Sequence, residues 1–577
     1  MLKLFKFLKP YRLSVMAALG LIFLQAISEL YLPTLMANIV DIGVVDGDTA
    51  YIFKVGILMI LIAIGGTLCA IVSSYLSAKT STAFGRDLRG QVFKRAEDFS
   101  LNEFDKIGAS SLITRTTNDI TQIQQVVMMS LRMMARAPMM AIGGIIMAVS
   151  KNAKLSLVIV FVIPIILLGI LAVAKKGVPL FKVMQTKLDK LNQVLRENLM
   201  GVRVIRAFNR IDHEKKRFKE ANYDLTSTAI KVNKLMSALM PTMSLILNFT
   251  TIAVIWFGAI KIDSGAMQVG DLMAFIQYVT QIMFALIMVS MMFVMIPRAS
   301  ASAVRINEVL DTIPEIKDPA KSSITDATST SGLVEFKNVI FSYPGAEEPA
   351  INDISFTARP GKVTAIIGGT GSGKSTLLNL IPRFYDIDSG SILLDGVDIR
   401  QMEQKNLRNK IGFVPQKAVL FTGTIAENIR YGKEDATDEE VRLAAEIAQA
   451  TEFISNMKDG FDSVIAQGGT NVSGGQKQRL SIARALVRRP EIYLFDDSFS
   501  ALDFKTDAKL RGALKGETTN STLIIVAQRV STIIDADQII VLDKGKIAGV
   551  GNHEELLKTC DVYREIVYSQ LSEEEIA

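Results

Sequence analysis

The chain contains few cysteines and few histidines for its 577 residues. It has two cysteines, Cys69 in an apolar run and Cys560 near the C-terminus, which provide neither a disulfide framework nor a metal-binding spacing. Its two histidines are His213 and His553, so an imidazole group can contribute to a site only at those positions. There is no low-complexity tract and no short-period repeat, which excludes a repeat architecture.

Charge is scarce in long stretches of roughly the first 300 residues, and the hydrophobic share of the whole chain is 49%, which is high for a soluble protein. About six apolar runs of near 20 residues or more are long enough to cross the hydrocarbon core of a bilayer. They cover residues 14–40, 51–77, 126–150, 155–174, 236–260 and 273–296. We therefore predict a polytopic membrane domain within a chain that is too long for one ordinary domain.

Lysine and arginine gather in alternate loops between these runs, before the first run and after the second and fourth. By the positive-inside rule, this alternation places both termini in the cytoplasm of a multi-pass protein of the cell membrane. Lys151 and Lys154, in an expected outer loop, depart from the rule. The net charge of +6 belongs to these flanks, and no basic–aromatic pattern outside them indicates nucleic-acid binding. The basic, amphipathic residues 1–13 favour an interfacial helix over a signal peptide, because no small-residue cleavage site follows the first run.

Two cytoplasmic loops are long, covering residues 79–125 and 176–235, and both combine helical periodicity with dense charge. We expect membrane helices that continue into the cytoplasm, with turns at residues 101–105 and 208–212. Two interpretations remain open. The extensions are either solvated charged helices or elements that transmit movement to a cytoplasmic domain.

A few ionisable residues fall inside the apolar runs or at their ends. Glu29 lies in the first run, and Arg132 and Arg136 lie one turn apart in the third. Such side chains either face a cavity or one another, or extend to the interface. Asp41, at the outer end of the first run, is either part of an external gate or a plain loop carboxylate. Methionines are dense in the third and sixth runs and suit either a promiscuous apolar pocket or a lipid-facing surface.

From residue 333 the pattern changes to short β-branched strands, glycine turns and helices, which indicates an α/β domain. The preceding residues 311–332 contain Pro314, Pro319 and a Ser/Thr/Gly run typical of a linker. We therefore predict a multidomain chain: an all-α polytopic membrane domain over residues 1–310, a linker over residues 311–332, and an α/β P-loop nucleotide-binding domain over residues 333–577.

A P-loop pattern lies between a predicted strand, residues 363–367, and a predicted helix, residues 376–380. Lys374 is expected to reach the terminal phosphates of ATP, and the Ser375 hydroxyl to bind Mg²⁺. A second strand, residues 492–495, places Asp496 at its carboxyl end, where it would hold the same ion. The phosphate-binding residues predicted from this pattern are Gly368, Gly371, Ser372, Gly373, Lys374, Ser375 and Thr376.

A second glycine motif follows about a hundred residues later, made of Ser473, Gly474, Gly475 and Gln476. Here the chain resembles the ATP-binding cassette (ABC) family, and the order of six spans, a linker and one cassette resembles a half-size ABC exporter. The resemblance implies that Tyr343 stacks on adenine and that Gln416 meets the γ-phosphate and Mg²⁺. It also implies a dimer in which residues 473–476 of one cassette complete the ATP site of the other, with residues 500–503 crossing the seam.

Two positions depart from the family pattern. Asp497 stands where a catalytic Glu is expected, and Gln528 stands where a phosphate-sensing His is expected. Gln467, ahead of the glycine motif at residues 473–476, also stands where exporters of this family typically have a Glu. Because a shorter carboxylate and an amide both impair water activation, the chain resembles the degenerate-site subunit of bacterial heterodimeric multidrug exporters, which implies a different partner chain and a small hydrophobic or amphipathic substrate. Three alternatives remain: substitutions tolerated in an active enzyme, a homodimeric lipid or peptide exporter, and an ATP-gated regulator or channel.

Overall fold

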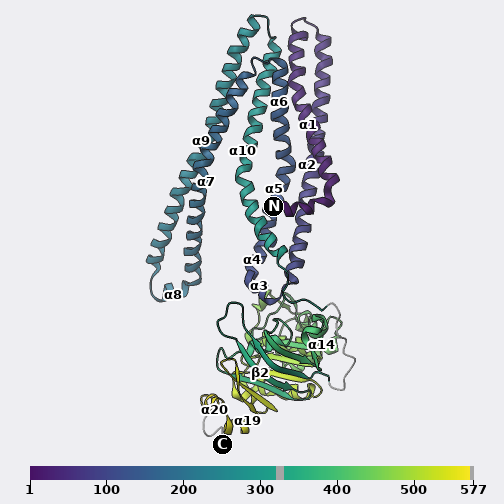
Figure 1. Ribbon diagram of the computed structural model, residues 1–577, viewed down its shortest axis with the longest axis vertical. Helices are drawn as coiled ribbons and strands as arrows, with labels where there is room; N and C mark the ends of the chain where they lie inside the picture. The colour runs from purple at the N-terminus through teal and green to yellow at the C-terminus, as the bar shows by residue number, and fades with distance from the viewer. Residues whose placement is uncertain (320–330, 572–577) are drawn as a thin grey trace. The chain divides into compact units, whose positions relative to one another are not determined.

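The computed structural model describes residues 1–319 and 331–571, and the chain divides into two compact units (Figure 1). Unit 1 comprises Met1–Glu97 and Gly108–Thr312. Unit 2 comprises Asp98–Ile107 and the chain from Ile313 onward, so a short piece of the first long loop belongs with the C-terminal part. Residues 320–330, the middle of the predicted linker, lie outside the described residues.

Unit 1 is helical. Within the described residues, six helices are long and apolar enough to cross a membrane, and the six predicted runs each overlap one of them. The predicted fold class is therefore confirmed for this part of the chain. Its elements are η1 (Leu2–Tyr11), α1 (Arg12–Asn38), η2 (Ile39–Val44), α2 (Thr49–Glu97), α4 (Ala109–Thr114), η3 (Arg115–Asp119), α5 (Ile120–Met129), η4 (Ser130–Met134), α6 (Ala135–Lys151), α7 (Leu157–Met200), α8 (Val202–Ala207), α9 (Ile211–Asp263) and α10 (Val269–Asp311).

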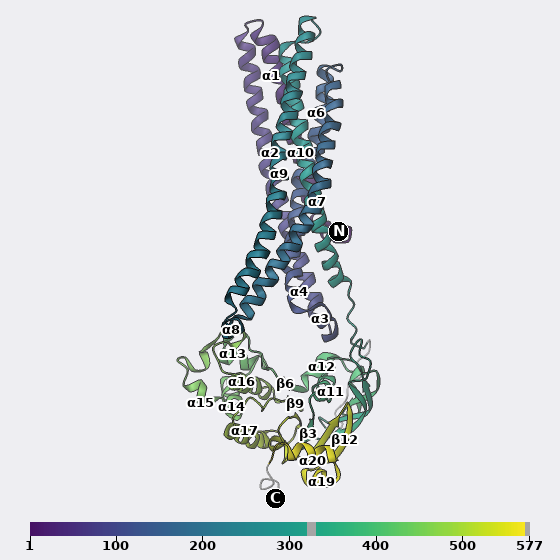
Figure 2. The same ribbon diagram turned by 90° about the vertical axis from the view of Figure 1, so that its left-hand side faces the viewer.

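The two turns predicted in the long loops have different structures. The first predicted turn, residues 101–105, is helical and forms most of α3 (Leu101–Ile107) in unit 2; the chain bends on its far side at Gly108, which has a φ of 81°. The second reversal runs through α8, and the residues between α8 and α9 end at Arg210, because Ile211 already begins α9. α7 and α9 run side by side along their length (Figures 1 and 2).

Small residues let α6 approach its two neighbours in unit 1. A Cβ atom on Gly143 would lie 2.4 Å from a methyl carbon of Leu30 in α1, and one on Gly144 would lie 2.8 Å from Ile282 in α10. Close backbone approach of this kind is the usual route to helix packing in lipid. The buried Tyr278 of α10 donates its hydroxyl to the Leu30 carbonyl at 3.1 Å, which fixes α10 against α1.

Unit 2 contains a six-stranded sheet in the order β12-β11-β3-β10-β9-β6. All its strands are parallel except β12, which pairs antiparallel with β11. A four-stranded antiparallel sheet, β2-β1-β4-β5, and a two-stranded one, β7-β8, complete the strands of the described residues. The strands are β1 (Val334–Phe341), β2 (Ile351–Ala358), β3 (Val363–Gly368), β4 (Ser389–Leu394), β5 (Val397–Asp398), β6 (Ile411–Val414), β7 (Gly423–Thr424), β8 (Val464–Ile465), β9 (Ile492–Asp496), β10 (Thr522–Val526), β11 (Gln538–Asp543) and β12 (Lys546–Gly551).

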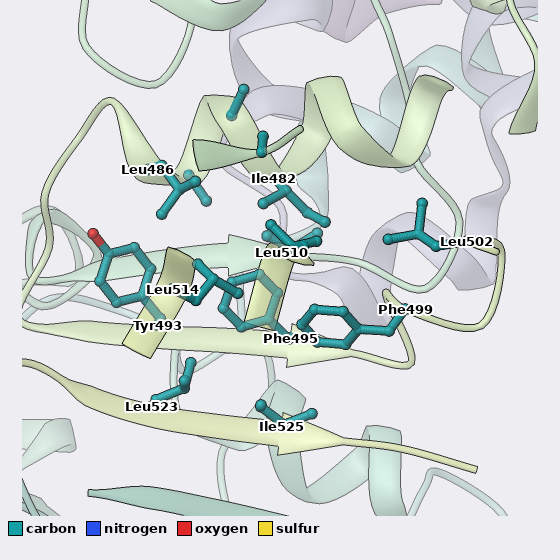
Figure 3. Packing of buried hydrophobic residues seen from close by; sticks show 14 of the residues in the cluster. Ile482, Leu486, Tyr493, Phe495, Phe499, Leu502, Leu510, Leu514, Leu523 and Ile525 are labelled. Atoms are coloured by element: carbon teal, nitrogen blue, oxygen red, sulfur yellow. The ribbon is translucent and has the colours of Figure 1, made fainter. Parts of the chain in front are cut away.

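Helices cover the parallel sheet. β9 and β10 are buried at every position, as expected of central parallel strands with both faces covered. Figure 3 shows Ile482 and Leu486 packing in the same cluster as Tyr493 and Phe495 of β9. This α/β architecture confirms the second half of the predicted fold class. The helices are α11 (Lys374–Leu380), α12 (Gln404–Asn409), α13 (Ile425–Arg430), α14 (Asp438–Ile447), α15 (Thr451–Ser455), α16 (Gly474–Leu486), α17 (Phe504–Glu517), α18 (Val530–Ile533), α19 (His553–Thr559) and α20 (Asp561–Tyr568).

Candidate nucleotide site

The candidate site lies at the carboxyl edge of the six-stranded sheet, where four neighbouring parallel strands end. β3 leads into the P-loop, β9 ends at Asp496, β10 is followed by Gln528, and β6 is followed by Gln416. Register brings these ends to one level, since Asp496 of β9 pairs with Val526 of β10, and Val526 pairs with Ile366 of β3. Residues far apart in sequence therefore meet at the position where open α/β sheets bind ligands.

The P-loop depends on glycine at its two ends. A Cβ atom on Gly368 would lie 2.2 Å from the carbonyl oxygen of Leu542. Gly373 has a left-handed φ of 97°, and its Cβ would lie 2.7 Å from the Ala350 carbonyl oxygen. The loop also carries Gly371, with a φ of 82°, and the buried Ser372. Glycine at these positions therefore lets the loop pack against neighbouring backbone and lead into the start of α11, where helix N–H groups suit a phosphate cradle.

Lys374 lies inside the loop. Its Nζ donates to the carbonyl oxygens of Gly368 at 2.8 Å and Gly369 at 2.7 Å. Burial lowers the pKa of Lys374, while the charges of Asp497 and Asp496 act in the opposite direction. The ammonium group is partly desolvated and held between carboxylates and loop carbonyls, so it is positioned for an incoming phosphate.

Ser375 and Asp496 are in contact, as their predicted shared role requires. The Ser375 hydroxyl donates to Asp496 Oδ1 at 2.9 Å. Burial raises the pKa of Asp496, and the charge of Asp497 adds to this effect. A hydroxyl and a carboxylate oxygen at one point fit the hard oxygen ligands that Mg²⁺ prefers.

Asp497 occupies a constrained position directly after β9. Its side chain is buried and its φ is 45°, a left-handed conformation that Asp tolerates better than most residues. Its Oδ2 accepts hydrogen bonds from Gln528 Nε2 at 2.9 Å and from Gln416 Nε2 at 3.2 Å. Of the three residues predicted as catalytic, Gln416 and Gln528 therefore each contact Asp497, and both amide nitrogens converge on one oxygen of its carboxylate.

Tyr343 belongs to an aromatic cluster at the other end of the site. Its ring is edge-on to Phe341 and to Tyr385, with centroids 5.0 and 5.5 Å away. Its hydroxyl lies 3.1 Å from the Thr376 hydroxyl of α11, which links the predicted adenine-binding residue to the P-loop helix. Within unit 2 these rings line a cavity of about 510 Å³. Burial raises the pKa of Tyr385 to about 12, so its hydroxyl stays protonated at neutral pH.

The second glycine motif begins α16. Ser473 and Gln476 form a reciprocal capping box, with Ser473 Oγ accepting from the Gln476 N–H at 3.3 Å and Gln476 Oε1 accepting from the Ser473 N–H at 2.9 Å. Ser473 and Gly474 are exposed and Gly475 is half-buried. The motif therefore presents a helix N-terminus on the surface of unit 2, where the dipole favours an anion.

Two residues at this site were missed by sequence reasoning. Arg529 donates to the carbonyl oxygen of Ser500 at 3.0 Å, which connects the segment after β10 to the loop after β9. Gln570, near the end of the described chain, hydrogen-bonds to the backbone of Gln528 and Val530. Neither carries a motif that would have identified it, because each acts through backbone groups distant in sequence.

The ionisable residues of unit 1 also find partners. Arg136 pairs with Glu29 at 2.5 Å, with both side chains about one-third exposed (33% and 30%), so these two charges face each other. Gln25 donates to the same Glu29 carboxylate at 2.9 Å. Arg132 instead donates to the Ser74 hydroxyl of α2 at 2.6 Å, and Asp41 accepts from the backbone N–H of Gly270 at 2.6 Å.

Comparisons with known proteins agree with this arrangement. The family model described as the ABC transporter transmembrane region matches residues 15–286, and the one described as ABC transporter matches residues 351–500. An uncharacterized ABC transporter ATP-binding protein of Mycobacterium tuberculosis is 44% identical over 98% of this chain and 97% of its own. An ATP-dependent lipid A-core flippase of Vibrio vulnificus is 31% identical over 99% of this chain and 97% of its own. The solved structure of a bacterial Atm1-family ABC exporter with ATP bound is similar with a TM-score of 0.82 at 28% identity, covering 97% of this chain and 100% of that one.

Proposed function

Since this chain belongs to the ABC transporter family as a half-size exporter, and ABC exporters work as dimers, we propose that it pairs with a different half-transporter and that its own nucleotide site retains ATP with little turnover. The complex would move small hydrophobic or amphipathic compounds, as multidrug exporters do. The chain is a multi-pass membrane protein. We place it in the cell membrane with both termini in the cytoplasm, on the basis of the basic flanks.

The groups that bind nucleotide are all present. The P-loop, Lys374 and the aromatic ring of Tyr343 supply contacts for phosphates and base. The oxygens of Ser375, Asp496 and Gln416 would hold Mg²⁺. When bound, this ion neutralises negative charge on the phosphates.

The groups that activate water are altered, and one observation carries the proposal. Asp497 Oδ2 accepts from Gln528 Nε2 and Gln416 Nε2 together. A carboxylate whose oxygen is engaged by two amides is less available to take a proton from water. Gln528 can donate a hydrogen bond to phosphate but cannot carry a positive charge. Nucleotide is therefore held by intact binding groups and hydrolysed slowly.

The glycine motif at residues 473–476 begins α16, with Ser473 and Gly474 exposed, which supports a role for this chain in completing the partner's ATP site. The dipole and the N–H groups at the start of α16 would stabilise the γ-phosphate there. Binding of ATP at both sites would bring the two cassettes together. Hydrolysis, mostly at the partner's site, would separate them again.

A homodimeric lipid exporter is the second candidate, and the similarity to the Vibrio vulnificus flippase favours it. In that case Asp497 would serve as the catalytic base in both sites of the dimer. The two candidates predict different subunit compositions of the purified complex. They also predict different ATPase rates after the charge of Asp497 is removed.

The test is to purify the chain from its native membrane, identify what co-purifies, and compare ATP hydrolysis of the complex before and after Asp497→Asn. The proposal expects a second, different half-transporter, and a total ATPase rate that stays within about twofold after the substitution, because most turnover belongs to the partner's site. A homodimer whose turnover falls by on the order of 10²-fold or more after Asp497→Asn would establish the second candidate instead.

A further inference from the structure

The segment that follows β10 is held by a residue from the end of the chain. Gln570 lies just after α20, and its side-chain amide uses both of its polar groups on this segment. Its Nε2 donates to the Gln528 carbonyl oxygen at 2.7 Å. Its Oε1 accepts from the Val530 N–H at 2.8 Å. One side chain thus bridges two backbone positions on either side of Arg529.

This bridge supplies a cap that the segment lacks. Val530 begins the short helix α18, and the preceding Arg529 makes no side-chain capping bond, since a guanidinium has no acceptor atom. The first N–H groups of a helix have no partner within the helix. Gln570 Oε1 takes that role for Val530, which is itself fully buried.

The bridged segment carries two contacts with the nucleotide site. Gln528 donates to Asp497, the residue in the catalytic-base position. Arg529 donates to the Ser500 carbonyl and stacks over Phe504, with 5.4 Å between its guanidinium carbon and the ring centroid. A shift of the 528–530 backbone therefore moves both the base and the loop after it.

Helix α20 packs into the core of unit 2, so it holds Gln570 at a fixed position beside residues 528–530. Tyr563 and Val567 of α20 are fully buried in the same core cluster as Val530 and Ile533 of α18. The backbone N–H of Gln570 also bonds to the Val567 carbonyl at 3.0 Å. Gln570 itself is exposed, so its substitution removes the bridge without opening the core.

We propose that Gln570 is a positioning residue that sets the side chain of Gln528 against Asp497, and thereby the contact between the site and the terminal phosphate of ATP. This inference rests on the proposed role of residues 497 and 528 beside the γ-phosphate, but not on the rate of hydrolysis. The side chain of Gln570 bonds to the backbone of residues 528 and 530. Its effect is confined to the backbone through which Gln528 and Arg529 act.

The test measures affinity for ATP and for ADP separately, with the purified full-length chain in nanodiscs and fluorescent analogues of ADP and of a poorly hydrolysed ATP. Gln570→Ala removes both bonds. Gln570→Glu keeps an acceptor for the Val530 N–H and loses the donor to Gln528. Ser569→Ala is the matched control, because the Ser569 hydroxyl bonds only to the Ile566 carbonyl of its own helix.

Loss of the two bonds should weaken ATP about three- to tenfold, with Gln570→Glu intermediate and the control unchanged. ADP, which lacks the γ-phosphate, should bind within about twofold of the parent. In a Gln528→Ala background, Gln570→Ala should have no further effect on ATP, because the side chain that it positions is gone. Equal losses for ATP and ADP, unchanged ATP affinity, or full additivity with Gln528→Ala would each overturn the proposal. None of these readouts depends on turnover, so a fast-hydrolysing site would refute the proposed function and leave this inference standing.

Discussion

Restoring the two altered groups should convert the site from ATP retention to ATP hydrolysis. The change is Asp497→Glu combined with Gln528→His, made in a complex whose partner has lost its own catalytic carboxylate, so that remaining turnover comes from this site. Both positions change together because Gln528 Nε2 lies 2.9 Å from Asp497 Oδ2. With Asp497→Glu alone, the amide of Gln528 would still donate a hydrogen bond to the longer carboxylate.

The expected gain follows from geometry. The added methylene extends the carboxylate by about 1.5 Å, and a misplacement of around 1 Å costs on the order of 10²-fold in rate. We therefore expect phosphate release to rise roughly 10²-fold in the double variant and less than about tenfold in either single variant. The effects are not additive, because the two side chains contact each other.

A backbone effect will accompany this change. Asp497 has a φ of 45°, and Asp is enriched among non-glycine residues in this region. Glu at this position should cost about 1 kcal/mol of stability, seen as a lower unfolding temperature, without reducing the rate per folded molecule. Asp497→Asn with Gln528→His is the control, since it supplies the imidazole without a carboxylate, and it should stay at background. If the double variant binds ATP normally and gains no turnover, the altered groups are not what limits hydrolysis.

Three further predictions concern the charges that the structure pairs or buries. Glu29→Gln should lower the thermal unfolding temperature in nanodiscs by removing the carboxylate of an intramembrane ion pair, at a cost of about 1–2 kcal/mol, and adding Arg136→Gln should recover most of it; equal losses in the single and double variants would contradict the pairing. Asp496→Asn should stabilise the nucleotide-free chain by about 1 kcal/mol at neutral pH while abolishing Mg²⁺-dependent ATP binding. Burial raises the pKa of Asp496 in the folded state, so the ionised carboxylate costs stability above that pKa, and the advantage of Asn should disappear as the pH falls through it. Asp119→Ala should destabilise unit 1 by about 2–3 kcal/mol in denaturant titrations, because the buried Asp119 accepts two hydrogen bonds from Arg305; an unchanged midpoint would show that this pair is not stabilising.

Local sequence patterns were sufficient to predict those parts of the site in which one short segment contains all the residues involved. The P-loop glycines, Lys374 and Ser375 lie in one short segment, directly between the strand that precedes it and the helix that it begins. The strand that delivers Asp496 is a continuous apolar run, so it reads as a central strand with few alternatives. The observed β3 and β9 each begin at the predicted residue and end one residue later, at Gly368 and Asp496.

Contacts between segments could not be predicted in the same way. Glu29 and Arg136 are 107 positions apart and lie in helices that are apolar on all sides, so periodicity does not reveal which faces meet. Gln416 reaches Asp497 across 81 positions, and Gln528 reaches it across 31, through a strand register that only the folded sheet defines. The chain reverses direction through a short helix at residues 101–107, where the sequence analysis predicted a turn at residues 101–105. Gly108, with its positive φ, marks the end of this helix.

The pairing of Asp497 with two amides gives Gln528 a role that its identity alone does not suggest. A buried carboxylate requires hydrogen-bond donors, since an unsatisfied buried charge is costly. Gln528 and Gln416 supply two such donors from the protein itself, both to Oδ2 of Asp497. A neutral histidine at position 528 would offer one donor only, on whichever ring nitrogen holds the proton. The amide therefore stabilises the buried carboxylate of the nucleotide-free site. In the function that we propose, the same contact also makes Asp497 Oδ2 less available to a water molecule.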